Sequence, residues 1–428
     1  MSGQTALDQS GDPAGRPPTD WRGEAMRRRI ARRYSAERRF RWLGFAAVFL
    51  SASFLAFLLV SMMANGFRGF TQTEVAVPID FPRSPVLIDP AALQTNPEQT
   101  LANANLPAVL DQASRAAFGV EETRLLSPDA VLALRKAIIA DPGILAGQTT
   151  LRLPASAGID LAVKSDGSEA DEALASQLDE NGALSSRFNA SFLIGSDGTD
   201  PTVVGIWGAL KGSLLTMVIT LALSFPIGVF SALYLEEYAP RNRWTDLIEV
   251  SINNLAAVPS IIFGLLGLAI FLNVMHLPRS APLVGGMTLA LMTMPVIVIA
   301  GRNAIKAVPP SIRDAALGIG SSPVQVVFHH VLPLALPGIL TGTIIGMARA
   351  LGETAPLLMI GMRAFISQPP GGFTDPATVL PVQIFLWSDE VGRGFIEKTS
   401  AAIIVLLAFL LTMNSIAIYL RNKFEKKW

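Results

Sequence analysis

The sequence contains no cysteine and only three histidines among its 428 residues. Disulfides, thiolate catalysis and cysteine-ligated metals are therefore excluded. Two of the histidines are adjacent, and neighbouring side chains on a helix point about 100° apart, so no metal site is expected. Charge is scarce too: 16% of the residues are charged, against roughly 25% in soluble proteins. With half of the residues hydrophobic and a mean hydropathy of +0.43, the composition favours a membrane protein.

A phosphate-binding loop of the form G-x-x-x-x-G-K-[ST] is also missing. That loop cradles nucleotide phosphates in many ATPases. We therefore expect this chain to bind no cofactor and to be no enzyme, with any ATP and Mg²⁺ held by a partner. Nor do we expect a nucleic-acid partner.

Long apolar runs are what the sequence does have. Residues 42–65 form 24 consecutive uncharged residues, which as a helix would extend about 36 Å, enough to cross a hydrocarbon core of roughly 30 Å. Further apolar runs follow at about 204–234, 247–272, 282–301, 336–361 and 400–420. The sequence thus predicts six transmembrane helices in an all-α polytopic protein, with residues 204–420 as the core.

Charge is segregated along the chain. Residues 1–41 hold ten arginines and five acids, and by the positive-inside rule this tail lies in the cytoplasm. Six crossings return the basic tail 421–428 to the same side. A cleavable signal peptide is the alternative for the first run, but 24 residues exceed the usual apolar region of about 7–15 residues and no A-x-A site follows.

Residues 66–203 contain no run long enough to cross a membrane and carry a large acidic excess, net −9 over 68–200. They predict a soluble extracytoplasmic insertion of α+β type. Ser127-Pro128-Asp129 predicts a helix start and Asp141-Pro142-Gly143 its end. Residues 149–154 and 159–163 alternate like half-buried strands, and 166–200 reads as loop.

Between the fourth and fifth runs, residues 308–337 form a segment with a distinct pattern. After two prolines, a short helix is predicted to end at Gly318 or Gly320. Ser322 can cap a second helix that begins at Pro323. The pattern predicts a rigid helix pair that a partner can grip, with an ordinary inter-span loop as the alternative.

The residues of this segment carry a resemblance. Their order, D-A-A-x₃-G-x₉-H-x-L-P, resembles the E-A-A-x₃-G-x₉-I-x-L-P coupling loop of ABC importer permeases. Asp314 stands where glutamate is usual, and His330 where isoleucine is usual. The resemblance implies that the segment docks on an ATP-hydrolysing subunit through Asp314, Ala315, Ala316, Gly320, Leu332 and Pro333.

Three further strings narrow the resemblance. They are Y-L-E-E-Y-A-P at 234–240, V-P-S-I-I-F-G-L-L-G-L-A-I-F at 258–271 and A-R-A-L-G-E-T-A-P-L-L-M-I-G at 348–361. They are similar to the PstA-type permeases of high-affinity phosphate importers, over about 205–425. The resemblance implies an inner-membrane protein that pairs with a PstC-like permease, a PstB-like ATPase dimer and a periplasmic phosphate-binding protein.

Arg349 and Glu353 fall inside the fifth apolar run. A charge at such depth costs about 2.5–3.5 kcal/mol on insertion scales and so faces a bundle interior or a polar cavity. A guanidinium can replace the hydration of an oxyanion with paired hydrogen bonds, which makes Arg349 the candidate substrate contact and Glu353 its counter-charge. A purely structural ion pair is the alternative. Arg302, at the end of the fourth run, is a candidate exit contact or a positive-inside anchor.

Two other functions stay open at this point. One is a permease for another oxyanion such as sulfate or molybdate. The other is a membrane sensor or scaffold for phosphate signalling, in which the acidic insertion senses an external state.

Overall fold

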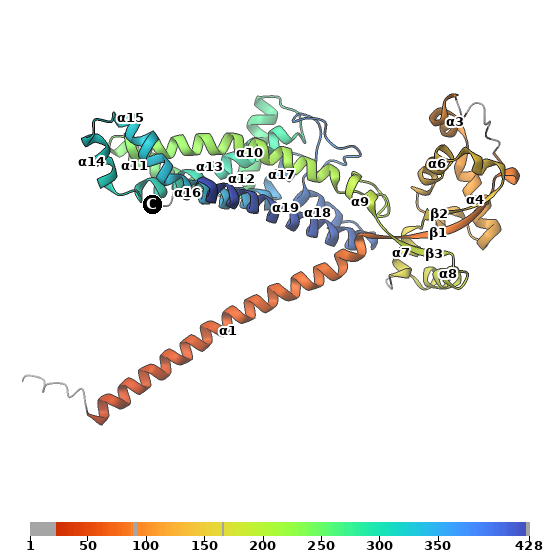
Figure 1. The fold of residues 1–428 in the computed structure, drawn as a ribbon, viewed down its shortest axis with the longest axis horizontal. Helices are drawn as coiled ribbons and strands as arrows, with labels where there is room; N and C mark the ends of the chain where they lie inside the picture. The colour runs from red at the N-terminus through yellow and green to blue at the C-terminus, as the bar shows by residue number, and fades with distance from the viewer. Residues whose placement is uncertain (1–22, 87, 89–92, 94, 165–166, 425–428) are drawn as a thin grey trace, which may run out of the picture. The chain divides into compact units, whose positions relative to one another are not determined.

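The computed structural model describes residues 23–424 apart from 87, 89–92, 94 and 165–166. Residues 1–22 of the predicted N-terminal tail and 425–428 of the predicted C-terminal tail lie outside the described residues. The chain divides into two compact units, residues 1–61 and 62–428, which we describe separately. Helices dominate the described residues (Figure 1).

Most of the first unit's described part belongs to α1 (Glu24–Gly69), a 46-residue helix that contains the predicted span 42–65. Its most apolar stretch has a mean hydropathy of 2.4, as expected of a helix that crosses lipid. The last residues of α1 belong to the second unit. There Gly66 and Gly69 press against α19 (Gly394–Phe424), so that a Cβ at either would meet Ser400 or Glu397 backbone.

The core of the second unit is a bundle in which α10, α13, α16 and α19 run side by side (Figure 1). Five helices of the described chain are long and apolar enough to cross a membrane, and a bent pair brings the number to six. The core elements are α10 (Trp207–Leu233), η3 (Tyr234–Tyr238), α11 (Arg243–Ala256), α12 (Ser260–Gly267), η4 (Leu268–Val274), α13 (Pro282–Lys306), α14 (Pro310–Gly318), α15 (Pro323–Gln325), η5 (Val326–Val331), α16 (Leu332–Gly352), α17 (Ala355–Met359), α18 (Leu380–Ser388) and α19.

Two runs that the sequence predicts as continuous helices are broken. The run 247–272 is split into α11 and α12, with a bend of 100° between them. Pro259 explains the break, because proline disfavours the helical conformation of the residue before it. The run 336–361 stops at Gly352, after which Glu353 has extended backbone angles. Glycine is a poor helix former and Pro356 follows closely, so α17 begins anew.

Small residues let the core helices approach closely. Gly342 of α16 leaves no room for a Cβ against Ala300 of α13, and one turn later Gly346 lies against Thr293. Such contacts replace hydrophobic burial as the source of helix association in lipid. They also fix the depth of α16 relative to α13.

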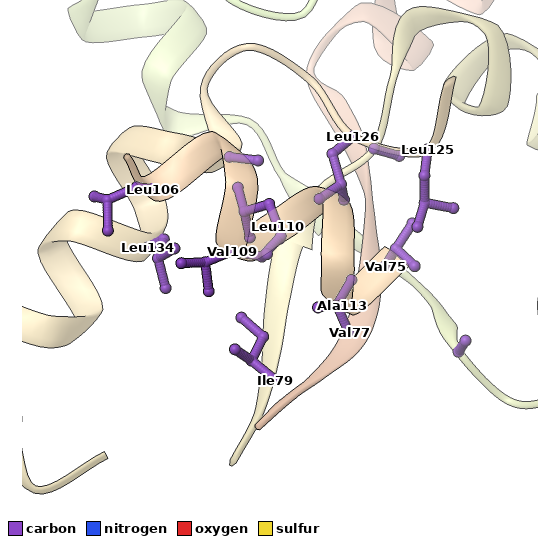
Figure 2. Close-up of a cluster of buried hydrophobic side chains, with 14 of the residues drawn as sticks. Val75, Val77, Ile79, Leu106, Val109, Leu110, Ala113, Leu125, Leu126 and Leu134 are labelled. Carbon is purple, nitrogen blue, oxygen red and sulfur yellow. The ribbon is translucent and has the colours of Figure 1, made fainter. Parts of the chain in front are cut away.

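The inserted domain (residues 71–195) is built on a three-stranded antiparallel sheet in the order β2-β1-β3. In the central strand β1, Val75, Val77 and Ile79 alternate into the core (Figure 2). Helices α4, α6 and α7 contact this sheet and contribute leucine and isoleucine side chains to one apolar cluster. The strands are β1 (Thr71–Asp80), β2 (Gln148–Pro154) and β3 (Leu184–Phe188), and the other elements are η1 (Phe81–Arg83), α3 (Pro97–Asn103), α4 (Leu106–Phe118), α5 (Glu122–Leu125), α6 (Ala130–Ala140), η2 (Pro142–Ala146), α7 (Ala157–Val163), α8 (Glu169–Glu180) and α9 (Ala190–Ile194).

The domain corrects two sequence predictions and confirms two. Helix α6 and strand β2 lie where they were expected. Residues 159–163, predicted as a strand, belong to α7, because Ser156 caps a helix there by accepting a hydrogen bond from the Ile159 amide. The segment 166–200, predicted as loop, holds α8, β3 and α9 among its described residues. Ser168 caps α8 in the same way.

A buried ion cluster joins the inserted domain to α19. The Lys164 ammonium donates to Asp160 Oδ2 at 2.8 Å, to Glu397 Oε2 at 3.0 Å and to the Thr71 carbonyl at 3.1 Å. All three charged side chains are about nine-tenths buried. The adjacent Lys398 donates to the Gly69 carbonyl at 2.9 Å. The cluster therefore holds the end of α1, β1, α7 and α19 together.

Replacing Lys164 by methionine should destabilise this junction by about 3–5 kcal/mol, because Asp160 and Glu397 would be left as buried, unpaired acids. Hydrogen–deuterium exchange of the Thr71–Val75 amides in the full chain measures the effect. Lys136→Met is the matched control, since Lys136 is exposed on α6. Equal exchange in the two variants would contradict a stabilising role for the cluster.

Candidate functional site

Arg349 and Glu353 are brought together, as their spacing predicts. Arg349 Nε lies 3.5 Å from Glu353 Oε1. The pair is not buried within this chain: 47% of the Arg349 side chain and 20% of the Glu353 side chain are exposed. A helix-internal pair buried on all sides is therefore excluded, and the guanidinium retains donors free to meet a substrate or another chain.

The pair lies beside the N-terminal half of α13, which begins at Pro282. Gly346 of α16 contacts Thr293, close to the middle of α13, and Arg349 is one turn further along α16. Beyond Gly352 the chain unwinds at Glu353 before α17 packs against α12. Non-helical backbone at membrane depth is tolerated only where protein buries it or a water-filled cavity borders it. Arg349 is therefore in the last turn of α16, and Glu353 lies in the break between α16 and α17.

The segment 308–337 folds as its residues predict at its tip. Helix α14 ends at Gly318, and Gly320 has a positive φ of 90°, which favours glycine. Ser322 and Gln325 form a reciprocal capping box at the start of α15. The second helix is not a separate piece, because α15 continues through η5 into α16 as one 30-residue helix.

The residues of the predicted docking motif differ in their exposure to solvent. Ala316 is buried against the core, whereas Asp314, Ala315 and Gly320 are exposed. Leu332 and Pro333 are half-buried at the start of α16. Large apolar side chains stand out at the same tip: Leu317, Ile319 and Val324 are all at least half exposed. The motif thus presents a mixed polar and apolar surface at one end of the bundle.

Arg313 anchors this surface to the core, a role that the sequence analysis missed. Its Nη2 donates to Glu237 Oε1 at 2.7 Å and to the Ile305 carbonyl at 3.0 Å. Its Nη1 donates to the Val308 carbonyl at 2.7 Å. Glu237 itself is 11% exposed. Helix α14 is therefore fixed to the end of α10 and to the end of α13 at once.

Arg302 takes part in a neighbouring network, apart from the Arg349 pair. Its Nη1 lies 2.9 Å from Glu249 Oε1, and its Nη2 donates to Glu236 Oε2 at 3.4 Å. Successive side chains of η3 diverge, so Glu236 reaches Arg302 while Glu237 reaches Arg313. Arg302 pairs with Glu236 and Glu249, whereas Arg349 pairs with Glu353.

One signal could have revealed the anchor. The string Y-L-E-E-Y-A-P places two acids directly after a long apolar run, where the positive-inside pattern favours bases. Acids at such a position call for basic partners. Arg241 and Arg243 are the nearest bases in the sequence, but in the structure the partners are Arg302, at the end of the fourth run, and Arg313, within the 308–337 segment.

The chain is similar to known transport proteins. Residues 224–427 match the family described as "Binding-protein-dependent transport system inner membrane component". Residues 27–172 match a domain of unknown function, DUF3333. Among solved structures, the MetNI methionine ABC transporter aligns over 52% of this chain and 98% of its own chain, at 17% identity and a TM-score of 0.42.

Two curated relatives cover much of the core. A probable ABC transporter permease protein, YqgI of Bacillus subtilis, is 34% identical over 40% of this chain, and the match spans 57% of its own length. The phosphate transport system permease protein PstA 1 of Mycobacterium tuberculosis is 30% identical over 51% of this chain and 70% of its own length. Together with the apolar helices, these matches confirm the resemblance: the chain is a multi-pass inner-membrane protein that belongs to the PstA-type family of phosphate transport system permeases.

Proposed function

We propose that the chain is the permease subunit of an ATP-driven, high-affinity importer of inorganic phosphate, and that it forms half of the translocation pathway. The observation that carries this proposal is the segment 308–337, whose tip is exposed and whose base is locked to two spans through Arg313 and Glu237. A docked ATPase that moves α14 would move α10 and α13 with it.

The partners follow from the same proposal. A PstC-like permease would supply the other half of the pathway and cover the exposed side of Arg349. A PstB-like ATPase dimer would bind ATP and Mg²⁺ and would hydrolyse ATP, so this chain itself is no enzyme. A periplasmic phosphate-binding protein would deliver the anion. Both termini would lie in the cytoplasm and the inserted domain in the periplasm, as the basic tails indicate.

Arg349 would make transient contact with phosphate, and Glu353 would orient it and prevent trapping. The guanidinium offers paired donors, while the carboxylate 3.5 Å away competes with the anion for them. Arg302 is a weaker candidate for an exit contact, because Glu236 and Glu249 already occupy its donors.

Uptake of radiolabelled phosphate tests the proposal, in phosphate-starved cells that lack their native permease and express this chain with its partners. We expect saturable uptake that excess unlabelled phosphate abolishes and that equal concentrations of sulfate or molybdate leave unchanged. Competition by sulfate or molybdate would favour another oxyanion as cargo. If the chain inserts into the membrane but phosphate, sulfate and molybdate are all not taken up, the sensor function would be favoured.

A further inference from the structure

Helix α11 presents three different faces. Thr245, Glu249, Ile252 and Ala256, spaced as one helical stripe, are half-buried against the core. Through this stripe α11 packs on α13, and Glu249 pairs with Arg302. Each of the other two faces is uncovered in the described chain.

The second face is apolar and exposed. Trp244, Leu247, Ile248 and Leu255 are 63%, 55%, 48% and 43% exposed. On a helix these positions cluster within about 100° of one another, and their centre lies about a third of a turn away from that of the stripe that contacts α13. The third face is mostly polar: Asp246, Asn253 and Asn254 are exposed on it, with Val250 between them. The helix therefore separates protein, apolar surroundings and water around its circumference.

The position of α11 places it at a membrane boundary. It follows the span of α10 and η3 after a linker of four residues, 239–242, and its Glu249 meets Arg302 near the end of α13. It lies at the same end of the bundle as α14 and α15 (Figure 1). A 14-residue helix is about 21 Å long, too short to cross a core of roughly 30 Å, and α12 departs from it at 100°.

The length of α12 and η4, which follow α11, indicates how deep α11 lies in the membrane. Helix α12 and η4 together contain 15 residues, which extend about 22 Å. Compared with roughly 30 Å of hydrocarbon, this crossing is short by several ångströms. If α12 starts inside the boundary, the shortfall matches the depth of about 5–10 Å at which interfacial helices lie.

The charges next to the apolar face indicate which kind of surface α11 binds. Arg241 and Arg243 precede the apolar face, and the Arg243 guanidinium stacks over the Trp244 ring at 5.6 Å. Tryptophan and arginine are typical of the headgroup region, where the ring is half immersed and the cation meets lipid phosphates. We propose that α11 is an interfacial helix that binds the anionic lipid surface and, through the Glu249–Arg302 contact, anchors the end of α13 to it.

The absence of cysteine makes a direct test simple, since single cysteines need no prior removal of native ones. Ile248→Cys, Leu255→Cys, Asp246→Cys and Asn253→Cys would each be spin-labelled in the full chain, assembled with its partners in vesicles of phosphatidylcholine and phosphatidylglycerol. Accessibility to oxygen, which enters lipid, is then compared with accessibility to a water-soluble nickel chelate.

We expect labels at 248 and 255 to favour oxygen at least about tenfold over labels at 246 and 253. Preference for nickel at all four positions would overturn the proposal in favour of a solvated helix. Protection of 248 and 255 from both reagents would overturn it in favour of a protein partner. The double variant Arg241→Gln/Arg243→Gln tests the role of charge. It should reduce the immersion of the label at 248 in the anionic vesicles and leave it unchanged in pure phosphatidylcholine. Equal effects in both membranes would overturn the preference for anionic lipid.

Discussion

Replacing Arg349 by glutamine is expected to lower phosphate uptake by about 10- to 100-fold at unchanged membrane abundance. The variant keeps a polar side chain, but it is shorter and loses the charge and the paired donors. Hydrogen bonds to charged groups contribute about 1.5–3 kcal/mol each, and each 1.4 kcal/mol is a factor of ten. Initial rates of radiolabelled uptake in phosphate-starved cells measure the loss.

Two further variants distinguish a phosphate contact at Arg349 from a structural ion pair. Arg363→Gln is the matched control, because Arg363 is an exposed arginine of the following loop and should leave uptake unchanged. Glu353→Gln should retain more uptake than Arg349→Gln if the arginine meets phosphate. If the pair only holds the helix end, the two single variants and their double variant should lose uptake equally. Full uptake in Arg349→Gln would exclude Arg349 from the pathway.

Replacing Arg313 by glutamine is expected to uncouple ATP hydrolysis from transport. The substitution removes the bonds that tie α14 to Glu237 and to the carbonyls of Ile305 and Val308. A docked ATPase could then shift α14 without moving α10 and α13. Phosphate transported per ATP hydrolysed, measured in proteoliposomes of the complete transporter, should fall by at least about tenfold, in line with about 1.5–3 kcal/mol for each charged hydrogen bond lost.

A double-mutant cycle with Glu237→Gln identifies the contact. Because the two side chains act as one link, the double variant should be no worse than the worse single variant. Lys306→Gln is the charge-matched control, since it removes a positive charge from the exposed end of α13. Additive losses, or an undiminished ratio in Arg313→Gln, would show that force passes by another route.

The difference between these two predictions reflects how each residue was found. Arg349 could be singled out from the sequence, because a charge in an apolar run is costly wherever the run folds. Arg313 could not, because its importance comes from a carboxylate 76 positions earlier in the chain. The two acids at 236–237 indicate that basic partners are needed, but which base meets each acid depends on the side-by-side packing of α10 and α13.

The inserted domain shows the same division. Helix α6 was predictable from its Ser-Pro-Asp start and its Asp-Pro-Gly end, which act locally. Residues 159–163 were predicted wrongly because five residues of alternating polarity suit either a strand or a turn of helix. The Ser156 cap and the buried Asp160–Lys164 pair, which helical spacing allows, settle them as helix.

Membrane embedding, the family and the tip of the 308–337 segment all followed from residue order alone, because apolar length, glycine conformation and capping are properties of short stretches of chain. The breaks at Pro259 and Gly352 also had local causes, but their consequences depend on how the helices pack. Only the packed bundle shows that the first break leaves an apolar face of α11 exposed and that the second leaves Arg349 exposed, because burial depends on which helices become neighbours.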